Sequence, residues 1–299
     1  MAEGSSNKKV QVEPEKTFRP PEEGDIIEYG GHEYRFGKFI DSGAFGLVYE
    51  CADEWDNELV AKVFMPKNQT YLEVQKLWSR ELNALRELRH PNVTFIHDAF
   101  ECNDTFYLII ERCALTIKDL IQRQQQLPNL SGEIWIPHVA RDVLQALHYI
   151  HESGYVHKDV HPGNVFVSLM NDKMFPGQNP VMRFKVGDLG ISNLESQIFP
   201  LNTFMANWML PPEYLKPDSF GVLDRRVDVY HVGLLFLSIL SKQELVFTVD
   251  DVLEGKPRQL AEKLESPYGP VIAKALRRHV DARTATAAEF WKEIKACAE

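Results

Sequence analysis

The segment YVHKDVHPGNVFV, residues 155–167, concentrates chemically reactive side chains in one short stretch. Its polar part runs from His157 to Asn164 and contains a Pro-Gly pair, which predicts a loop, while the valines on either side predict short strands. Asp159 in this loop is either an ordinary surface-turn residue or part of a functional site. The local sequence leaves both interpretations open.

A second segment of this kind is FKVGDLGIS, residues 184–192, in which a predicted strand leads into Asp188. Asp188 and Asn164 together offer the hard oxygen ligands that suit Mg²⁺ bound to a triphosphate. If the two loops meet in the fold, we expect a magnesium nucleotide site there.

Two earlier segments could bind the phosphates of such a nucleotide. In IDSGAFGLVYE, Gly43 and Gly46 would let the backbone approach a phosphate closely, although a plain hairpin turn explains the same glycines. In ELVAKVF, Lys62 lies inside an apolar strand and needs an anionic partner, for which Glu81 in the following helix is the candidate. The alternative is that Lys62 extends to solvent from an edge strand and that Glu81 is solvated.

The elements that must position these residues change in character along the chain. Residues 1–24 are rich in Lys, Glu, Pro and Ser and predict a disordered tail. Residues 25–113 show strand patterns around glycine turns and one helix at about 70–88, and residues 114–299 show mainly helical patterns. We therefore expect an α+β, bilobal fold: a small antiparallel sheet lobe with one main helix, ending in a hinge, and a larger helical lobe.

The composition is that of a soluble globular protein, with 299 residues of which 44% are hydrophobic and 25% charged. A net charge of -10 argues against binding to bare nucleic acid or acidic membrane. The longest apolar run, at 232–240, is too short to span a bilayer, and the N-terminus does not resemble a signal peptide. The spacing of the four cysteines suits neither a metal site nor a disulfide framework, so we expect a cytoplasmic protein with reduced thiols.

In their order along the chain, these segments resemble the motifs of eukaryotic-type protein kinases over residues 30–299. The family pattern is a Gly-rich loop, a strand lysine, a helix glutamate, H-R-D-x-x-x-x-N, D-F-G and A-P-E. The matching stretches here are D-x-G-x-x-G-x-V, Lys62, Glu81, HKDVHPGN, DLG and the PPE that ends at Glu213. HPN at 90–92 and DVYHVG at 228–233 resemble further landmarks, and Arg283 matches the arginine that pairs with the A-P-E glutamate.

The resemblance implies a transferase that uses ATP and Mg²⁺, most simply a serine/threonine-protein kinase. Asp159 would accept the proton of the attacking hydroxyl, and Lys62, held by Glu81, would bind the α- and β-phosphates. Asn164 and Asp188 would hold Mg²⁺. The implied ATP-binding residues are Ile40, Gly43, Ala44, Phe45, Gly46, Val48, Val60, Lys62, Ile110, Glu111, Cys113 and Phe166.

Several departures from the family pattern bear on activity. Asp41 replaces the first loop glycine, and Lys158 replaces the arginine of H-R-D, which usually forms a bidentate pair with a phosphorylated activation segment. The hydroxyls available for such phosphorylation are Ser192, Ser196 and Thr203. His161 stands where Ser/Thr kinases carry lysine, and residues 169–183 form an insertion relative to the family.

Two alternatives to a protein kinase remain open. The D-x-H-x-x-N pattern at His161 resembles small-molecule kinases of the aminoglycoside and choline type, and Asp41 with His161 would also suit an ATP-binding pseudokinase or scaffold. Glu213 and Arg283 favour a peptide-docking platform, which small-molecule kinases generally lack. The expected partner is therefore a protein substrate with a Ser/Thr hydroxyl, while a regulatory protein and the oligomeric state are left open. Neither a nucleic acid partner nor a membrane span is expected.

Replacement of His161 by lysine should leave phosphotransfer equal or higher, because lysine neutralises the γ-phosphate more fully than imidazole does. The measurement is kcat/KM for transfer from labelled ATP by wild type and His161→Lys, with thermal unfolding as the check on folding. A large loss in a well-folded variant would show that the histidine has its own catalytic or substrate-binding role.

Overall fold

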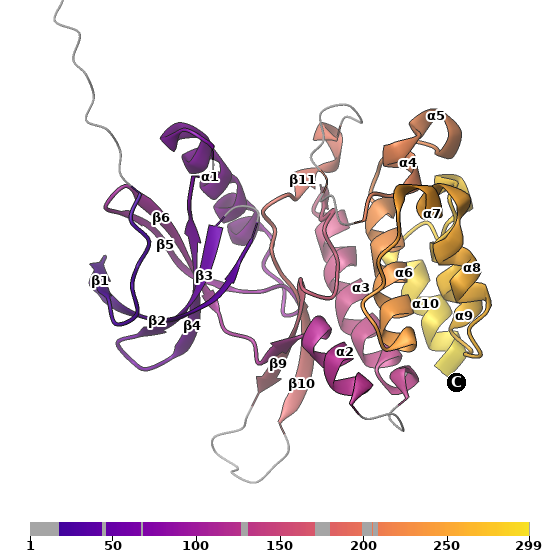
Figure 1. Cartoon of the computed structure of the whole chain (residues 1–299), viewed down its shortest axis with the longest axis horizontal. Helices are drawn as coiled ribbons and strands as arrows, with labels where there is room; N and C mark the ends of the chain where they lie inside the picture. The colour runs from indigo at the N-terminus through magenta and orange to yellow at the C-terminus, as the bar shows by residue number, and fades with distance from the viewer. Residues whose placement is uncertain are drawn as a thin grey trace, which may run out of the picture. The chain divides into compact units, whose positions relative to one another are not determined.

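The structure is a computed structural model that describes residues 18–43, 46–66, 68–126, 131–170, 180–198, 205 and 209–298. It confirms the α+β fold class, with an antiparallel sheet in the N-terminal region and helices in the C-terminal region (Figure 1). The chain divides into two compact units. The first contains the described part of Met1–Trp78 together with Ala99–Leu108, and the second contains Ser79–Asp98 and the described part of Ile109–Glu299. The domain boundaries predicted after residues 24 and 113 stay a prediction.

The N-terminal sheet has six strands in the order β1-β2-β3-β4-β6-β5. Strand β4 shows how the sequence positions its polar residue: Leu59, Ala61 and Val63 are buried, while Val60 and Lys62 alternate with them on the other face. The strands are β1 (Ile26–Tyr29), β2 (His32–Ser42), β3 (Gly46–Asp53), β4 (Glu58–Phe64), β5 (Ile96–Cys102) and β6 (Thr105–Glu111).

An aromatic cluster in the first unit fixes the start of helix α1 (Tyr71–Glu87). The ring centroid of Phe106 lies 5.1 Å from that of Tyr71 and 5.1 Å from that of Trp78, and Phe18 packs 6.0 Å from Tyr71. The Arg19 N–H also donates to a threonine hydroxyl of β6 at 3.0 Å. The end of the predicted disordered tail therefore makes specific contacts, while residues 1–17 lie outside the described residues.

The second unit is built around α6 (Arg226–Ser241), which is buried on nearly all sides and therefore forms its core. It packs against α3 (Ile136–Glu152), which also packs directly against α10 (Ala287–Ala298), and the Phe236 and Phe290 rings of α6 and α10 meet at 5.5 Å (the helices are labelled in Figure 1). The other helices are α2 (Ile117–Gln125), α4 (Pro212–Leu215), α5 (Pro217–Phe220), α7 (Val249–Glu254), α8 (Lys256–Glu262) and α9 (Gly269–Ala275), with 3₁₀ turns η1 (Gly132–Ile134), η2 (Glu195–Gln197) and η3 (Val280–Ala282).

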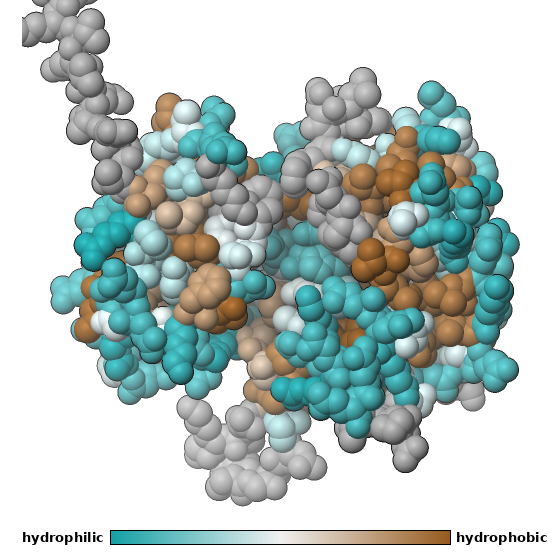
Figure 2. Space-filling view, viewed as in Figure 1, coloured by the Kyte–Doolittle hydropathy of each residue, from teal (hydrophilic) through white to brown (hydrophobic). Residues whose placement is uncertain are grey.

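On the visible surface of this helical region, hydrophobic patches alternate with hydrophilic ones (Figure 2). Isolated exposed valines such as Val222 and Val246 contribute apolar surface of the kind that folded proteins ordinarily show. Within the described ranges, no helix has the length and apolar character needed to cross a membrane.

Two small sheets position the loops of the predicted site. Strands β9 (Val165–Met170) and β10 (Val181–Val186) form a hairpin beside β7 (Leu115–Thr116), and β8 (Tyr155–Val156) pairs with β11 (Asn193–Leu194). Because Val165 lies opposite Val186, the loop before β9 and the loop after β10 meet at the same end of the hairpin. The hairpin strands include the two ends of the predicted insertion, whose middle, residues 171–179, lies outside the described residues.

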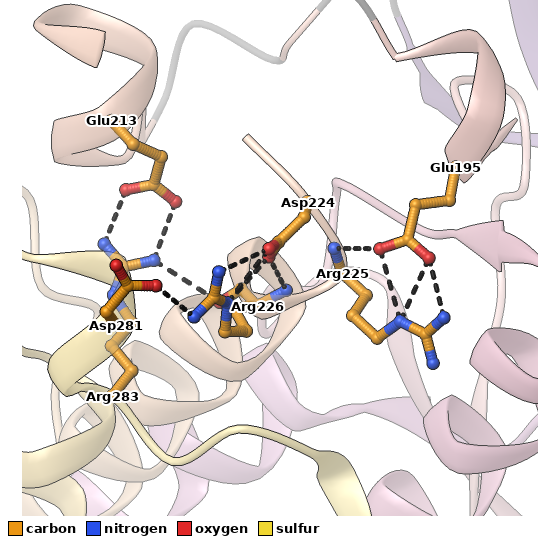
Figure 3. A network of polar contacts seen from close by, with 7 residues as sticks. All are labelled: Glu195, Glu213, Asp224, Arg225, Arg226, Asp281 and Arg283. Atoms are coloured by element: carbon orange, nitrogen blue, oxygen red, sulfur yellow. Dashed lines mark hydrogen bonds and ion pairs between the residues drawn. The ribbon is translucent and has the colours of Figure 1, made fainter. Parts of the chain in front are cut away.

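A buried ion pair links α4 to the segment before α10, as the sequence predicts. The side chains of Glu213 and Arg283 are both 0% exposed, and Arg283 Nη1 donates to Glu213 Oε1 at 2.7 Å. Arg283 Nε also donates to the Arg277 carbonyl at 2.6 Å. Figure 3 shows that Arg226, which pairs with Asp224 and Asp281, lies beside this contact.

Replacement of Arg283 by methionine should destabilise the protein by about 3–5 kcal/mol, because it leaves the Glu213 carboxylate buried without a counter-charge. The measurement is the free energy of unfolding from a urea titration. The matched control is Arg258→Met, which removes an exposed pair with Glu262 and should change that free energy by about 0.5 kcal/mol or less. Equal losses in the two variants would contradict the role assigned to the buried pair.

Candidate active site

One buried carboxylate holds the loop at residues 157–164. Asp228, in the first turn of α6, accepts the N–H groups of His157 at 2.9 Å and Lys158 at 2.7 Å, and the ring N–H of His151 at 2.8 Å. Burial disfavours its ionisation, but the hydrogen bond and charge of His151 and the backbone donor outweigh this effect and lower the pKa of Asp228 to about 2. The carboxylate therefore stays ionised and fixes the start of the loop.

His157 connects this loop to the turn that follows β10. Its Nδ1 accepts the Asp159 N–H at 3.2 Å, and its Nε2 lies 3.1 Å from the Gly187 carbonyl oxygen. Since a carbonyl can only accept, the ring proton is on Nε2 and the imidazole is neutral. The ring thus sets the distance between Asp159 and the turn that carries Asp188.

Asp159 and Asn164 are in direct contact. The Asn164 Nδ2 donates to the Asp159 carbonyl and to Asp159 Oδ2, both at 3.0 Å. With its NH₂ group used in this way, Asn164 has its side-chain oxygen as the atom that can bind a cation. The Gly187 N–H donates to the Asn164 carbonyl at 3.0 Å, so the two loops are also joined through the backbone.

Two carboxylates of the second unit gather around Gly190. Asp188 has a left-handed backbone with a φ of 56°, and its Oδ1 accepts the Gly190 N–H at 3.2 Å. A Cβ at Gly190 would lie 2.9 Å from Glu81 Oε2 and 3.1 Å from Asp188 Oδ1, so only glycine lets both carboxylates approach. Of these groups, the Asp188 carboxylate, like the side-chain oxygen of Asn164, is a hard oxygen donor of the kind that Mg²⁺ prefers.

Lys158 is buried with a φ of 70°, and its Nζ donates to Asn193 Oδ1 at 2.8 Å. Arg80 Nη2 donates to the same oxygen at 2.7 Å. Burial, followed by the nearby charge of Arg80, lowers the pKa of Lys158 to about 8. Two cations therefore share one neutral acceptor at the position where the family carries arginine.

The segment after Asp188 is held by a further ion pair. Arg225 donates to Glu195 through its backbone N–H at 2.9 Å, through Nε at 3.0 Å and through Nη2 at 2.7 Å (Figure 3). Of the hydroxyls that the sequence offers for phosphorylation, Ser192 is buried with its Oγ 3.4 Å from the His157 carbonyl, and Ser196 is exposed. Thr203 lies outside the described residues.

The predicted phosphate-binding residues of the first unit lie on neighbouring strands. Val48 is the cross-strand partner of Lys62, and Asp41 is the partner of Val48. The Gly43 N–H donates to the Gly46 carbonyl at 2.9 Å, and a Cβ at Gly46 would clash with the carbonyl of Val63. Gly46 is therefore required by packing whether or not a phosphate binds. Ile40 is exposed on β2, and Ala44 and Phe45 lie outside the described residues.

The predicted adenine-binding residues of the second unit have distinct surroundings. The Glu111 N–H donates to the Phe95 carbonyl at 2.9 Å, so Glu111 has only its carbonyl to offer a base. In the described part of the chain, no backbone group bonds the N–H or carbonyl of Cys113, whose thiol pKa is raised to about 12 by burial. Ile110 and Phe166 are half-buried, and the Phe166 ring packs against Gly187.

Comparison with known proteins decides the family. A family model for the protein kinase domain matches residues 34–294. The chain belongs to the protein kinase family. It is 27% identical over 215 residues to serine/threonine-protein kinase TAO3 of Pongo abelii, and 28% identical over 215 residues to serine/threonine-protein kinase TAO2 of Homo sapiens. It is 26% identical over 208 residues to cyclin-dependent kinase-like 4 of Mus musculus.

These matches cover 71% of this kinase for TAO3 and TAO2 and 69% for cyclin-dependent kinase-like 4. In the other direction they cover 22% of TAO3, 16% of TAO2 and 56% of cyclin-dependent kinase-like 4. The kinase therefore resembles one part of each relative.

Within the second unit, the kinase brings Glu81 close to Asp188 and Asp159 into contact with Asn164. The predicted phosphate-binding residues Lys62, Gly43 and Gly46 belong to the first unit. Sequence reasoning missed Arg80 and Asn193, which are bonded to each other beside Lys158, and the pair of Arg225 with Glu195. The partners of Arg80 are 113 residues away and those of Arg225 30 residues away, so no local pattern could have indicated them.

Lys158 should make the stability of the kinase depend on pH. Its folded-state pKa of about 8 lies below its usual value, so between about pH 8 and about pH 10.5 the folded chain binds fewer protons than the unfolded chain. The free energy of unfolding of wild type, measured relative to Lys158→Met, should therefore rise with pH across this window.

Urea titrations at pH 7, 8, 9 and 10 measure this difference, with Lys263→Met as the control because this lysine is exposed. The control difference should stay constant. If the difference between wild type and Lys158→Met were also independent of pH, the prediction would be wrong. The ammonium of Lys158 would then be stabilised in the folded protein as well as in water.

Proposed function

We propose that this chain is a serine/threonine-protein kinase that transfers the γ-phosphate of Mg-ATP to a Ser or Thr hydroxyl of a protein. The observation that carries the proposal is the contact of Asn164 Nδ2 with Asp159 Oδ2, in a loop joined to the Asp188 turn by His157 and Gly187. These contacts support the proposal because they hold Asp159 beside Asn164 and tie their loop to the turn that carries Asp188. Positioning of this kind supplies most of the rate in phosphoryl transfer.

In this proposal Asp159 accepts the proton of the attacking hydroxyl as its oxygen bonds to the γ-phosphorus. Asn164 Nδ2 donates to Asp159 Oδ2 and so orients the carboxylate that would accept the proton. Asp188 and the side-chain oxygen of Asn164 would hold Mg²⁺, whose charge assists ADP as it leaves. The products are the phosphorylated hydroxyl, ADP and a proton that Asp159 releases.

The ATP-binding residues are part of the same proposal. Lys62, on the face of β4 opposite its buried side chains, would bind the α- and β-phosphates and pair with Glu81. Val48 and Val60 would contact one face of adenine and Phe166 the other, with Ile40 and Ile110 beside it. The glycines Gly43 and Gly46 would cover the phosphates. The backbone polar groups for the base would be the Glu111 carbonyl and the Cys113 N–H, since the Glu111 N–H is bonded to Phe95.

Two findings support a protein as the substrate. The buried pair of Glu213 and Arg283 holds the region that the family pattern predicts to dock a peptide, and relatives of this chain are named serine/threonine-protein kinases. All four cysteines are free thiols, which suits the proposed cytoplasmic location. A small-molecule acceptor is the second candidate. It is favoured by His161, whose Nδ1 accepts the Gly163 N–H at 3.1 Å while Nε2 lies 3.8 Å from Asp159 Oδ1.

Replacement of Asp159 by alanine should reduce phosphotransfer at least about 10³-fold, because it removes both the base and the contact that orients Asn164. The assay uses labelled ATP and Mg²⁺ with casein or myelin basic protein, followed by phosphoamino acid analysis. Mg-ATP affinity by calorimetry should change only a few-fold. The matched control is Asp218→Ala, an exposed aspartate on α5, which should keep full activity.

Label on serine or threonine that disappears in Asp159→Ala establishes the proposed function. Wild-type turnover by Asp159→Ala would overturn the mechanism. Mg-ATP binding without transfer to either protein would favour a small-molecule acceptor or a scaffold.

A further inference from the structure

A surface hollow of about 450 Å³ lies in the second unit, along the segment that joins α1 to β5. Its floor is formed by Leu85, Leu88 and Val93, which are buried apolar side chains. Apart from Glu111, none of its lining residues belongs to the proposed nucleotide site or to the proposed catalytic residues. Its volume lies within the range of about 300–1,000 Å³ that is usual for ligand pockets.

The segment that forms one wall is rigidly attached to β10. The Thr94 N–H donates to the Val186 carbonyl at 2.9 Å, and the Val186 N–H donates to the Asn92 carbonyl at 2.8 Å. The Asn92 side chain adds a bond to the Phe184 carbonyl at 2.9 Å. The hollow is therefore preformed, so a ligand would not have to order this wall on binding.

The rim combines an exposed aromatic ring with a cation. Phe95 is 43% exposed at the edge of the hollow, and the Arg89 guanidinium lies 5.6 Å from the centre of its ring. The His97 ring meets Phe95 edge-on at 5.1 Å. An aromatic side chain held at the surface above an apolar floor is a common feature of protein contact sites.

Of the charged side chains that line the hollow, Lys185 and Glu111 form a pair, whereas Arg89 does not take part in one among the described residues. Lys185 Nζ bonds both carboxylate oxygens of Glu111, at 2.6 and 2.8 Å, so these two charges neutralise each other. Arg89 has no carboxylate partner among the described residues. His90 Nδ1 accepts the Asn92 N–H at 3.1 Å, which places the ring proton on Nε2. The rim therefore presents N–H donors to a ligand.

We propose that this hollow is a docking site for a short peptide segment of a partner protein, in which an acidic residue stands beside a bulky apolar one. The acidic group would bind Arg89 and the His90 Nε2–H, and the apolar side chain would pack on Leu85, Leu88 and Val93. A peptide fits better than a small metabolite, because Phe95, Arg89 and Pro91 leave the rim open whereas small-molecule sites enclose most of their ligand. This site does not depend on the proposed catalytic function.

The test is selection of a random seven-residue peptide library on the immobilised full chain, with Arg89→Glu as the variant and Arg258→Glu as the control. Both arginines are exposed, and thermal unfolding checks that both variants fold. Wild type and Arg258→Glu should enrich peptides with Asp or Glu next to Leu, Phe or Met. Arg89→Glu should lose this preference.

The most enriched peptide, carrying fluorescein, is then titrated with each protein by fluorescence anisotropy. Its affinity should fall at least about tenfold for Arg89→Glu and for Phe95→Ala, and exchange of its acidic residues for lysine should restore binding to Arg89→Glu. Absence of an acidic and apolar consensus, or equal binding by wild type and Arg89→Glu, would overturn the proposal. Concentration-dependent dimerisation that only Arg89→Glu abolishes would assign the hollow to a second copy of the chain and also overturn it.

Discussion

The carboxylate of Asp228 is the constraint on which the predicted site depends. A buried carboxylate is costly unless donors surround it, and Asp228 has two backbone N–H groups of the 157–164 loop and the ring of His151. These bonds give the loop a fixed start although it has no regular secondary structure. They also help to stabilise Lys158 in a left-handed backbone conformation, which is unfavourable for a residue with a side chain.

The loop that Asp228 holds is in turn joined to the turn that carries Asp188, through hydrogen bonds of uncharged groups. His157 bonds the Asp159 N–H with one ring nitrogen and the Gly187 carbonyl with the other, and the Gly187 N–H returns to Asn164. The candidate general base is therefore positioned through its backbone N–H and carbonyl and by the Asn164 amide that donates to its carboxylate. The Asp188 carboxylate is held in its turn by the Gly190 N–H.

Cationic side chains from other parts of the chain bind three residues that follow Asp188. Lys158 and Arg80 converge on Asn193, Arg225 holds Glu195, and Arg283 holds Glu213. The first of these contacts joins two cations to a neutral amide oxygen, whereas each of the other two joins an arginine to a carboxylate.

The sequence determined the α+β class, the positions of the buried strands and the protein kinase family, because these depend on periodicity and on motifs within short windows. It also predicted the pair of Glu213 with Arg283, although only through the family pattern. It could not indicate that Arg80 joins Lys158 at Asn193, or that Lys185 uses both oxygens of Glu111. Such partners lie 74 to 113 residues apart, and only the packing of β10 and α1 against their neighbours brings the charges together. The tertiary structure decided these contacts because a charged side chain pairs with whichever group the fold places within reach, and this is independent of distance along the chain.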